Sequence, residues 1–403
     1  MFRRVYLDNS ATTPVDNRVI EEMLPFLTEK FGNASSIHFF GQEARSAVDR
    51  ARHQVASAIN ARPNEIVFTS GGTESNNLAI RGLVEANEKY GKHIITSQIE
   101  HPAVKNVCEV LEKRGFEITY LPVYEDGIVK IEDVKNALRE DTVLISIMTA
   151  NNEIGSVLPL KAIGKVCKDK GVLFHTDAVQ AVGKIPLDVE DMGIDLLSLT
   201  AHKIYGPKGV GALYVRKKGP RVRLEPQIDG GGHERGMRSG TLAVPMIVGL
   251  GAACDLARRE MPEETARTFR LRERLRKGIM DQLPETFLNG HPTERLPGNA
   301  NISFAYVEGE GLMMGIKDVA VSSGSACTSA SLEPSYVLRA LGIGDELAHS
   351  SIRFGIGRFN TEAEVDFVVD LVTREVSRLR EMSPLFEMVQ QGIDITKIEW
   401  AAH

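Results

Sequence analysis

Cysteine, tryptophan and long apolar runs are scarce in this chain of 403 residues. It holds one tryptophan and only four cysteines, which are Cys108, Cys167, Cys254 and Cys327. No two cysteines form a C-x-x-C pair, which argues against a disulfide framework and against a zinc site. No stretch approaches the roughly 20 apolar residues that a membrane-spanning helix needs, and no apolar segment of a secretory signal follows the first residues. We therefore expect a cytoplasmic protein with no membrane partner and no resident metal.

A concentrated positive charge is also missing. The formal net charge is -6, and charged residues make up 25% of the chain. The densest basic group is short and isolated, as in a solvated turn; it consists of Arg216, Lys217, Lys218, Arg221 and Arg223. Because nucleic-acid binding calls for a continuous basic face, no nucleic-acid partner is expected.

Short apolar runs alternate with helical patterns over the first two thirds of the chain. Strands are expected at residues 65–70, 93–97, 142–148, 171–176, 195–199 and 211–215. Helices are expected at 74–85 and 102–114. This alternation predicts an α/β fold with a mostly parallel sheet that helices cover.

The pattern changes near Met261 and Pro262. A long charged helix is expected at about 263–282, and an amphipathic helix at 367–382. Shorter segments between them, at 301–304 and 312–322, suit a smaller α+β unit. A chain of this length is ordinary for two domains.

A glycine-rich turn follows the strand expected at residues 65–70. Gly71, Gly72 and Thr73 come between that strand and the helix. Glycine lets the backbone approach an anion, and a helix N-terminus attracts one through its free N–H groups and its dipole. The turn therefore suits a phosphate group, although the same residues also suit a plain helix start.

Lys203 follows another strand and precedes the turn Gly206-Pro207-Lys208-Gly209. A ligand at the carboxyl edge of the sheet meets such a lysine. If partly desolvated, its amine becomes a nucleophile able to form a Schiff base. Thr200 and His202 flank it and are placed to hold a phosphate. A surface charge is the alternative for a lysine taken alone.

Asp177 ends a further apolar strand and needs a partner there. An anionic Asp can keep a pyridinium nitrogen protonated, so that the ring accepts electrons from a carbanion. Capping of a helix N-terminus is the alternative. A phosphate cradle, a strand-end Asp and a strand-end lysine together indicate a pyridoxal-phosphate site.

Cys327 differs from the other three cysteines, which lie among apolar residues and suit a core. It lies in a run of small residues, 321–331, that has no amphipathic period. Such a run predicts an accessible loop, and an accessible thiol is available for nucleophilic chemistry. An incidental thiol is the alternative.

Several segments of the chain resemble the cysteine desulfurases, which belong to the class V aminotransferase-like pyridoxal-phosphate enzymes. The matching segments are 6–14 (YLDNSATTP), 151–155 (NNEIG), 202–208 (HKIYGPK), 235–241 (RGMRSGT) and 322–329 (SSGSACTS). The tail, at 383–388 and 398–403, is similar to the housekeeping type that supplies iron–sulfur cluster assembly. The chain departs from the family pattern at Ile99, where threonine is common, and at Thr200, where serine is common.

The resemblance implies a pyridoxal-phosphate fold of type I and a role for each matching residue. Catalytic roles are implied for Lys203 as the Schiff-base lysine, His101 above the ring and Cys327 as the persulfide carrier. Contacts to the cofactor are implied for Gly72, Thr73, Asn152, Asp177, Gln180, Thr200, His202, Lys203 and Thr241. Contacts to the substrate carboxylate are implied for Asn33, Asn152 and Arg353. Spacing alone does not favour Arg353 over Arg358.

The implied activity converts L-cysteine to L-alanine and leaves sulfur on Cys327. The implied partners are a second copy of the chain, reached through Thr241, an iron–sulfur scaffold protein and other sulfur acceptors; Cys327 would transiently ligate a cluster on such a partner. The implied large domain spans 15–262, and 1–14 joins 263–403 in the small domain. Selenocysteine lyase, an aminotransferase and a non-catalytic sulfur-assembly scaffold are the alternatives.

Overall fold

A seven-stranded sheet forms the centre of the larger part of the molecule. The computed structural model describes residues 4–219, 222–323 and 333–391. The strands lie in the order β2 (Ile66–Thr69), β8 (Gly211–Val215), β7 (Leu196–Thr200), β6 (Leu173–Asp177), β5 (Thr142–Ser146), β3 (His93–Ser97) and β4 (Glu117–Leu121). Only β8 runs antiparallel to its neighbours. The prediction of a mostly parallel sheet is confirmed.

Helices cover both faces of this sheet, and the strand residues alternate between two cores. Val67 packs with α4 (Gly72–Asn87) and α5 (Pro102–Glu112). Its neighbours Ile66 and Phe68 face the other core, which includes α3 (Phe39–Ala58) and α7 (Leu160–Lys170). Successive strand side chains point to opposite faces, so apolar strands of this kind require cover on both sides.

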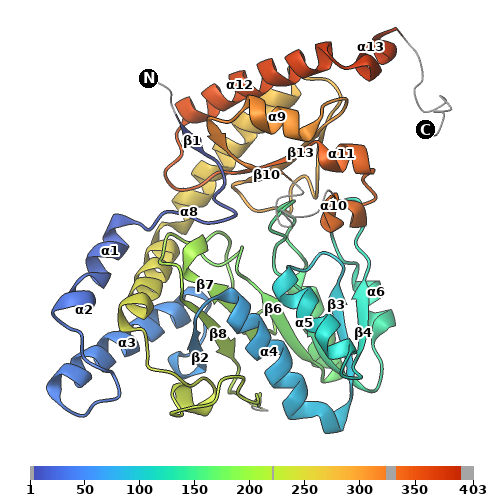
Figure 1. The fold of residues 1–403 in the computed structure, drawn as a ribbon. Coiled ribbons are helices and arrows are strands. Elements are labelled where there is room, and N and C mark those ends of the chain that lie inside the picture. The colour runs from blue at the N-terminus through green and yellow to red at the C-terminus, as the bar shows by residue number, and fades with distance from the viewer. Residues whose placement is uncertain (1–3, 220–221, 324–332, 392–403) are drawn as a thin grey trace.

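A smaller antiparallel sheet lies above the large one (Figure 1). Its order is β12 (Ser322–Ser323), β13 (Ser351–Gly355), β10 (Asn299–Phe304) and β9 (Thr286–Leu288). α12 (Glu362–Glu381) and α9 (Gly309–Gly315) pack on it around a separate core. The chain start joins this core, since β1 (Val5–Tyr6) pairs in parallel with β11 (Val319–Ala320). The expected smaller α+β unit is confirmed.

One helix, α8 (Val244–Met280), runs from the large part into the small one (Figure 1). The predicted helix at 263–282 was therefore wrong in its start, because α8 continues through Pro262. Proline usually ends a helix, since it removes a backbone donor. The preceding half is buried and rich in glycine and alanine, so it shows no amphipathic stripe. The predicted domain boundary at residue 262 lies within this helix.

The remaining elements are short. They are α1 (Asn17–Met23), α2 (Pro25–Thr28), α6 (Ile131–Ala137), α10 (Tyr336–Ala340), α11 (Asp345–His349), α13 (Pro384–Gln390) and the 3-10 turns Pro63–Glu65, Glu88–Tyr90, Ala201–Lys203 and Glu234–Gly236. The strand expected at 171–176 begins two residues later, because Gly171 takes a left-handed conformation and ends α7. No helix in the described part of the chain is long and apolar enough to span a membrane.

Candidate active site

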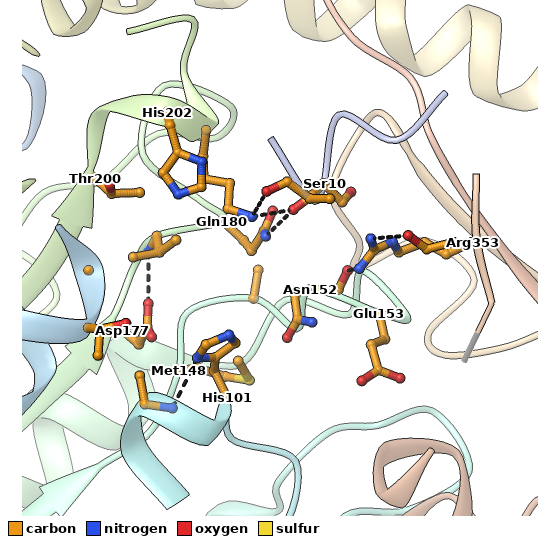
Figure 2. Close-up of a pocket in the computed structure, with 18 of the residues that line it drawn as sticks. Ser10, His101, Met148, Asn152, Glu153, Asp177, Gln180, Thr200, His202 and Arg353 are labelled. Atoms are coloured by element: carbon orange, nitrogen blue, oxygen red, sulfur yellow. Dashed lines mark hydrogen bonds between the residues drawn. The ribbon is translucent and has the colours of Figure 1, made fainter. Parts of the chain in front are cut away.

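A cavity of about 340 Å³ opens where the parallel strands end, between the large sheet and the small one. Ten of the predicted site residues line it: Gly72, Thr73, His101, Asn152, Asp177, Gln180, Thr200, His202, Lys203 and Arg353. Figure 2 shows His101, Asp177, Gln180 and His202 arranged around one space, with Arg353 on the opposite side. Ligands bind at the carboxyl ends of strands in open α/β sheets, and the cavity follows that rule.

Lys203 ends a 3-10 turn that directly follows β7. Its Nζ donates to the carbonyl oxygen of Ser10 at 2.6 Å and to that of Ala11. Gln180 donates through Nε2 to the same Ser10 oxygen at 2.9 Å. The amine is thus held at the cavity wall by the N-terminal segment.

Asp177 is buried at the end of β6, where two donors hold its carboxylate. Asn76 donates through Nδ2 at 2.7 Å, and the backbone N–H of Val179 donates at 2.9 Å. The second contact resembles a local cap, which was the alternative role for this residue. Because Asn76 comes from α4 and Asp177 from the sheet, the carboxylate also has a fixed place at the cavity floor.

His101 is the N-cap residue of α5, and its Nδ1 accepts from the backbone N–H of Ala103 at 3.1 Å. Burial lowers the pKa of His101. The charge of the nearby Asp177 raises this pKa in part, and the charge of Lys203 lowers it further. A ring that accepts at Nδ1 carries its proton at Nε2. The geometry therefore supports a neutral imidazole that can take up or release a proton at the cavity.

The residues of the predicted phosphate cradle line the cavity, and Gly72 and Thr200 lie close to each other there. Gly72 begins α4, and a Cβ atom there would lie 2.7 Å from the Val179 side chain. Thr200 donates to the carbonyl oxygen of Val210 at 3.1 Å, while Nδ1 of His202 lies 3.1 Å from the Thr12 hydroxyl. Burial and the charge of Lys203 lower the pKa of His202 to about 4. Hydroxyls, a neutral imidazole and a helix N-terminus are a donor set that suits a phosphate.

Arg353 lies on β13 across the cavity from this cradle. It donates to Asp8, Ser322 and the carbonyl oxygen of Asn152, and its Nε is buried without an acceptor in the described part of the chain. Arg358 lies outside this cavity and pairs with Asp16 and Glu264. Arg353 is therefore the arginine available to a ligand there.

Three predicted residues do not line the cavity. Asn33 is exposed, and its side chain accepts from the backbone N–H of Ser35 at 2.9 Å. Thr241 is also exposed on the surface of this single chain. Cys327 lies outside the described residues. Their assigned roles remain predictions.

Some cavity residues were not predicted from the sequence. Ser10 and Asn76 contact the predicted lysine and aspartate, and Ser322 contacts Arg353. Asn76 lies four residues after Gly72, which places the two on one face of a helix and was a usable signal. The contacts of Ser10 and Ser322 join distant segments, for which the sequence held no signal. Within the described residues, no group of three or more His, Cys, Asp or Glu side chains suits a metal ion.

Comparison with known proteins agrees with this geometry. Residues 5–368 match the class-V aminotransferase family. Cysteine desulfurase IscS of Anaeromyxobacter sp. (strain Fw109-5) is 61% identical over 398 residues, which cover 98% of each chain. A solved NifS-like protein has a TM-score of 0.87 at 40% identity, covering 93% of this chain and 99% of its own. A structure of SspA in complex with cysteine has a TM-score of 0.79 at 38% identity, covering 89% of this chain and all of its own. This chain belongs to the cysteine desulfurases of the class-V aminotransferase family.

Proposed function

We propose that this protein uses pyridoxal phosphate to convert L-cysteine to L-alanine and transfers the sulfur to Cys327. The single observation that carries the proposal is the gathering of Lys203, Asp177 and His101 around one cavity with Arg353 on its far side. The kinship to cysteine desulfurases and to a protein solved with cysteine supports L-cysteine as the substrate.

The residues present fit the cofactor. Thr73, Thr200 and His202 would hold its phosphate at the start of α4, and Asp177 would pair with its ring nitrogen. Gln180, whose Nε2 already faces the Lys203 end of the cavity, would contact the ring hydroxyl. When bound, pyridoxal phosphate supplies an electron sink for a carbanion next to the amino group.

The chain's own groups account for binding and proton movement. Arg353 would bind the substrate carboxylate, with Asn152 beside it. The amine of Lys203 would remove the α-proton, since it lies at the cavity wall. His101, as a neutral imidazole, would exchange a proton with a ligand in the cavity.

Sulfur transfer balances without an external oxidant. The thiol of Cys327 and L-cysteine become a persulfide on Cys327 and L-alanine. The Cβ–S bond of the substrate breaks, an S–S bond forms, and the substrate carbon takes up the hydrogen that sulfur loses. The persulfide would then pass to an acceptor, which for this family we propose to be an iron–sulfur scaffold protein in the cytoplasm.

The deciding test measures alanine and sulfide together after incubation with pyridoxal phosphate, L-cysteine and a reducing thiol. Equal amounts are expected, and Cys327→Ala should abolish both while still binding L-cysteine. Lys203→Ala should abolish turnover entirely. Full sulfide release by Cys327→Ala would refute the relay, and a requirement for a keto acid would indicate an aminotransferase instead.

We also propose a homodimer in which Thr241 reaches the phosphate site of the partner. Thr241 is exposed in the single chain, which supports this proposal. Three apolar side chains are also exposed there: Phe31 by 69%, Ile37 by 91% and Phe39 by 68%. Mixing Lys203→Ala with Thr241→Ala subunits should restore activity, because one site of each mixed dimer then holds both native residues. Failure of mixed dimers to regain activity would place Thr241 within its own subunit's site.

The tail beyond residue 391 lies outside the described residues, and docking of a scaffold protein there remains a prediction. A chain truncated after Gln391 should lose affinity for the scaffold while keeping its turnover of L-cysteine. Unchanged affinity would remove the docking role.

A further inference from the structure

The guanidinium of Arg353 is oriented by three partners that leave part of it unused. Its Nη2 donates to Oδ1 of Asp8 at 2.8 Å and to Oγ of Ser322 at 2.9 Å, and its Nη1 donates to the carbonyl oxygen of Asn152 at 3.1 Å. Arg353 is only 6% exposed, and its Nε has no acceptor within the described residues. A guanidinium has five N–H donors, and Nη1 of Arg353 keeps one of its two unused among the described residues, so an acceptor such as a carboxylate in the cavity would complete its hydrogen bonding.

Backbone pairing brings the side chains of Asp8, Ser322 and Arg353 together. Ser322 lies opposite Arg353 in the β12–β13 ladder, and Asp8 bridges to Gly355, two residues further along the same strand. Residues two apart on a strand share a face. A Cβ atom on Gly355 would lie 2.8 Å from the backbone nitrogen of Ser10, so glycine there allows the N-terminal segment to approach β13.

Asp8 contacts both Arg353 and Ser322. Arg353 and Ser322 line the cavity, but Asp8 does not. Ser322 donates to Oδ1 of Asp8 at 2.9 Å and closes a ring of three hydrogen-bonded side chains. Asp8 therefore acts on a ligand through the contacts of Arg353 and Ser322 and through its charge, and not by lining the cavity.

We propose that Asp8 is a positioning residue that sets how strongly Arg353 binds the carboxylate of the substrate. The inference rests on the proposed function. As an acceptor, the Asp8 carboxylate holds the guanidinium in one orientation. As a negative charge, it offsets part of the attraction between Arg353 and a second carboxylate, which allows the product L-alanine to leave.

These two effects are separable by substitution. Asp8→Asn retains an oxygen acceptor but removes the charge, so the Kd of L-alanine should fall about threefold at low ionic strength. Asp8→Ala removes the acceptor as well, and loss of this charge-assisted hydrogen bond should outweigh the effect of the lost charge and raise the Kd about tenfold overall. Binding is followed through the absorbance of the pyridoxal-phosphate enzyme. L-Alaninamide, which lacks the carboxylate, should bind all three proteins alike.

Asp16→Asn is the matched control. Asp16 forms a buried pair with Arg358 at 2.8 Å in the same N-terminal region but does not line the cavity. It should leave the Kd of L-alanine unchanged, which separates local positioning from general loosening of this region. If Asp8 had only a structural role, the Asp8 and Asp16 variants would change the Kd of L-alanine alike. A change in the Asp8 variants alone supports positioning.

Two results would overturn the inference. One is an equal Kd for L-alanine in the unaltered protein and both Asp8 variants; the other is an equal effect on L-alaninamide. The variant Arg353→Gln distinguishes a failure of the inference about Asp8 from a failure of the proposed function. If Arg353→Gln weakens L-alanine binding but the Asp8 variants do not, only the role of Asp8 is wrong. If Arg353→Gln has no effect, the assigned carboxylate site and the inference fail together.

Discussion

Glu100 illustrates how one buried side chain stabilises the cavity wall next to His101. Its Oε1 accepts from the Ser97 hydroxyl and from the backbone N–H of Met148, both at 2.8 Å, so it joins the ends of β3 and β5. Its Oε2 is buried without a partner in the described part of the chain. Burial raises the pKa of Glu100 from its ordinary 4.5 to about 8.

This shift predicts a pH-dependent stability. Between the two pKa values the folded protein keeps a proton that the unfolded chain has released, so the free energy of unfolding falls as pH rises through this window. Glu100→Gln keeps the acceptor and does not titrate. Its stability relative to the unaltered protein should therefore increase between about pH 5 and about pH 8, measured by urea unfolding. A constant difference across this range would show that Glu100 does not hold its proton.

At the residue scale, the sequence predicted which side chains gather at the cavity better than it predicted which side chains contact one another. Lys203 and Gly72 follow strands and Asp177 ends one, and strand ends of a parallel sheet meet at one edge, so their gathering was predictable. The contact of Asp8 with Arg353 was not, because it joins positions 345 residues apart. Such pairing depends on where the N-terminal segment packs, which no local pattern encodes.

At the scale of elements, the approach of the N-terminal segment to β13 depends on Gly355. Gly355→Ala forces a Cβ atom against the backbone of Asn9 and Ser10. We expect a loss of about 1–3 kcal/mol in unfolding free energy, as for other overpacked sites, together with weaker L-alanine binding because Asp8 moves. Gly219→Ala is the control, since its Cβ would meet no atom of the described residues within 4 Å, its chain neighbours aside. Equal effects of both substitutions would contradict the close approach.

A buried ion pair joins α3 to the 3-10 turn Glu234–Gly236, beside the edge strand β2. Arg52 and Glu234 meet through two contacts of 2.7 Å, and Glu234 also accepts from the backbone N–H of Phe68 at 2.8 Å. Arg52→Met leaves a buried carboxylate without its cation and should cost about 3–5 kcal/mol. Adding Glu234→Gln should recover most of this loss in urea unfolding. A loss under 1 kcal/mol for the single variant would contradict this account.

Elements with clear boundaries were predicted well. The strands at 93–97 and 211–215 have the predicted bounds, because each is a short apolar run between turn residues. The long helix was misjudged because residues 247–254, two turns near its start, are buried on all sides and because Pro262 marks a false end. Burial on all sides removes the periodicity from which a helix is recognised.

At the scale of the whole molecule, the cavity lies between two separately packed cores. Lys203, Asp177 and His101 belong to the large part, and Arg353 belongs to the small sheet. A ligand held by both parts would report any change in their relative placement. Under the proposed function, the substrate carboxylate would be one group through which the small part, by way of Arg353, acts on the chemistry of the large one.

The passage of α8 through both cores has a consequence for thermal unfolding. Leu250 and Cys254 pack in the large core, and Leu275 and Ile279 pack in the small one, all on one continuous helix. Melting either core exposes half of this helix and removes the support of the other half. Calorimetry should therefore record one heat-absorption peak for the chain, with calorimetric and van't Hoff enthalpies that agree. Two resolved peaks would mean that α8 breaks at Pro262 before the second core melts. The helix would then separate the unfolding of the two cores instead of coupling it.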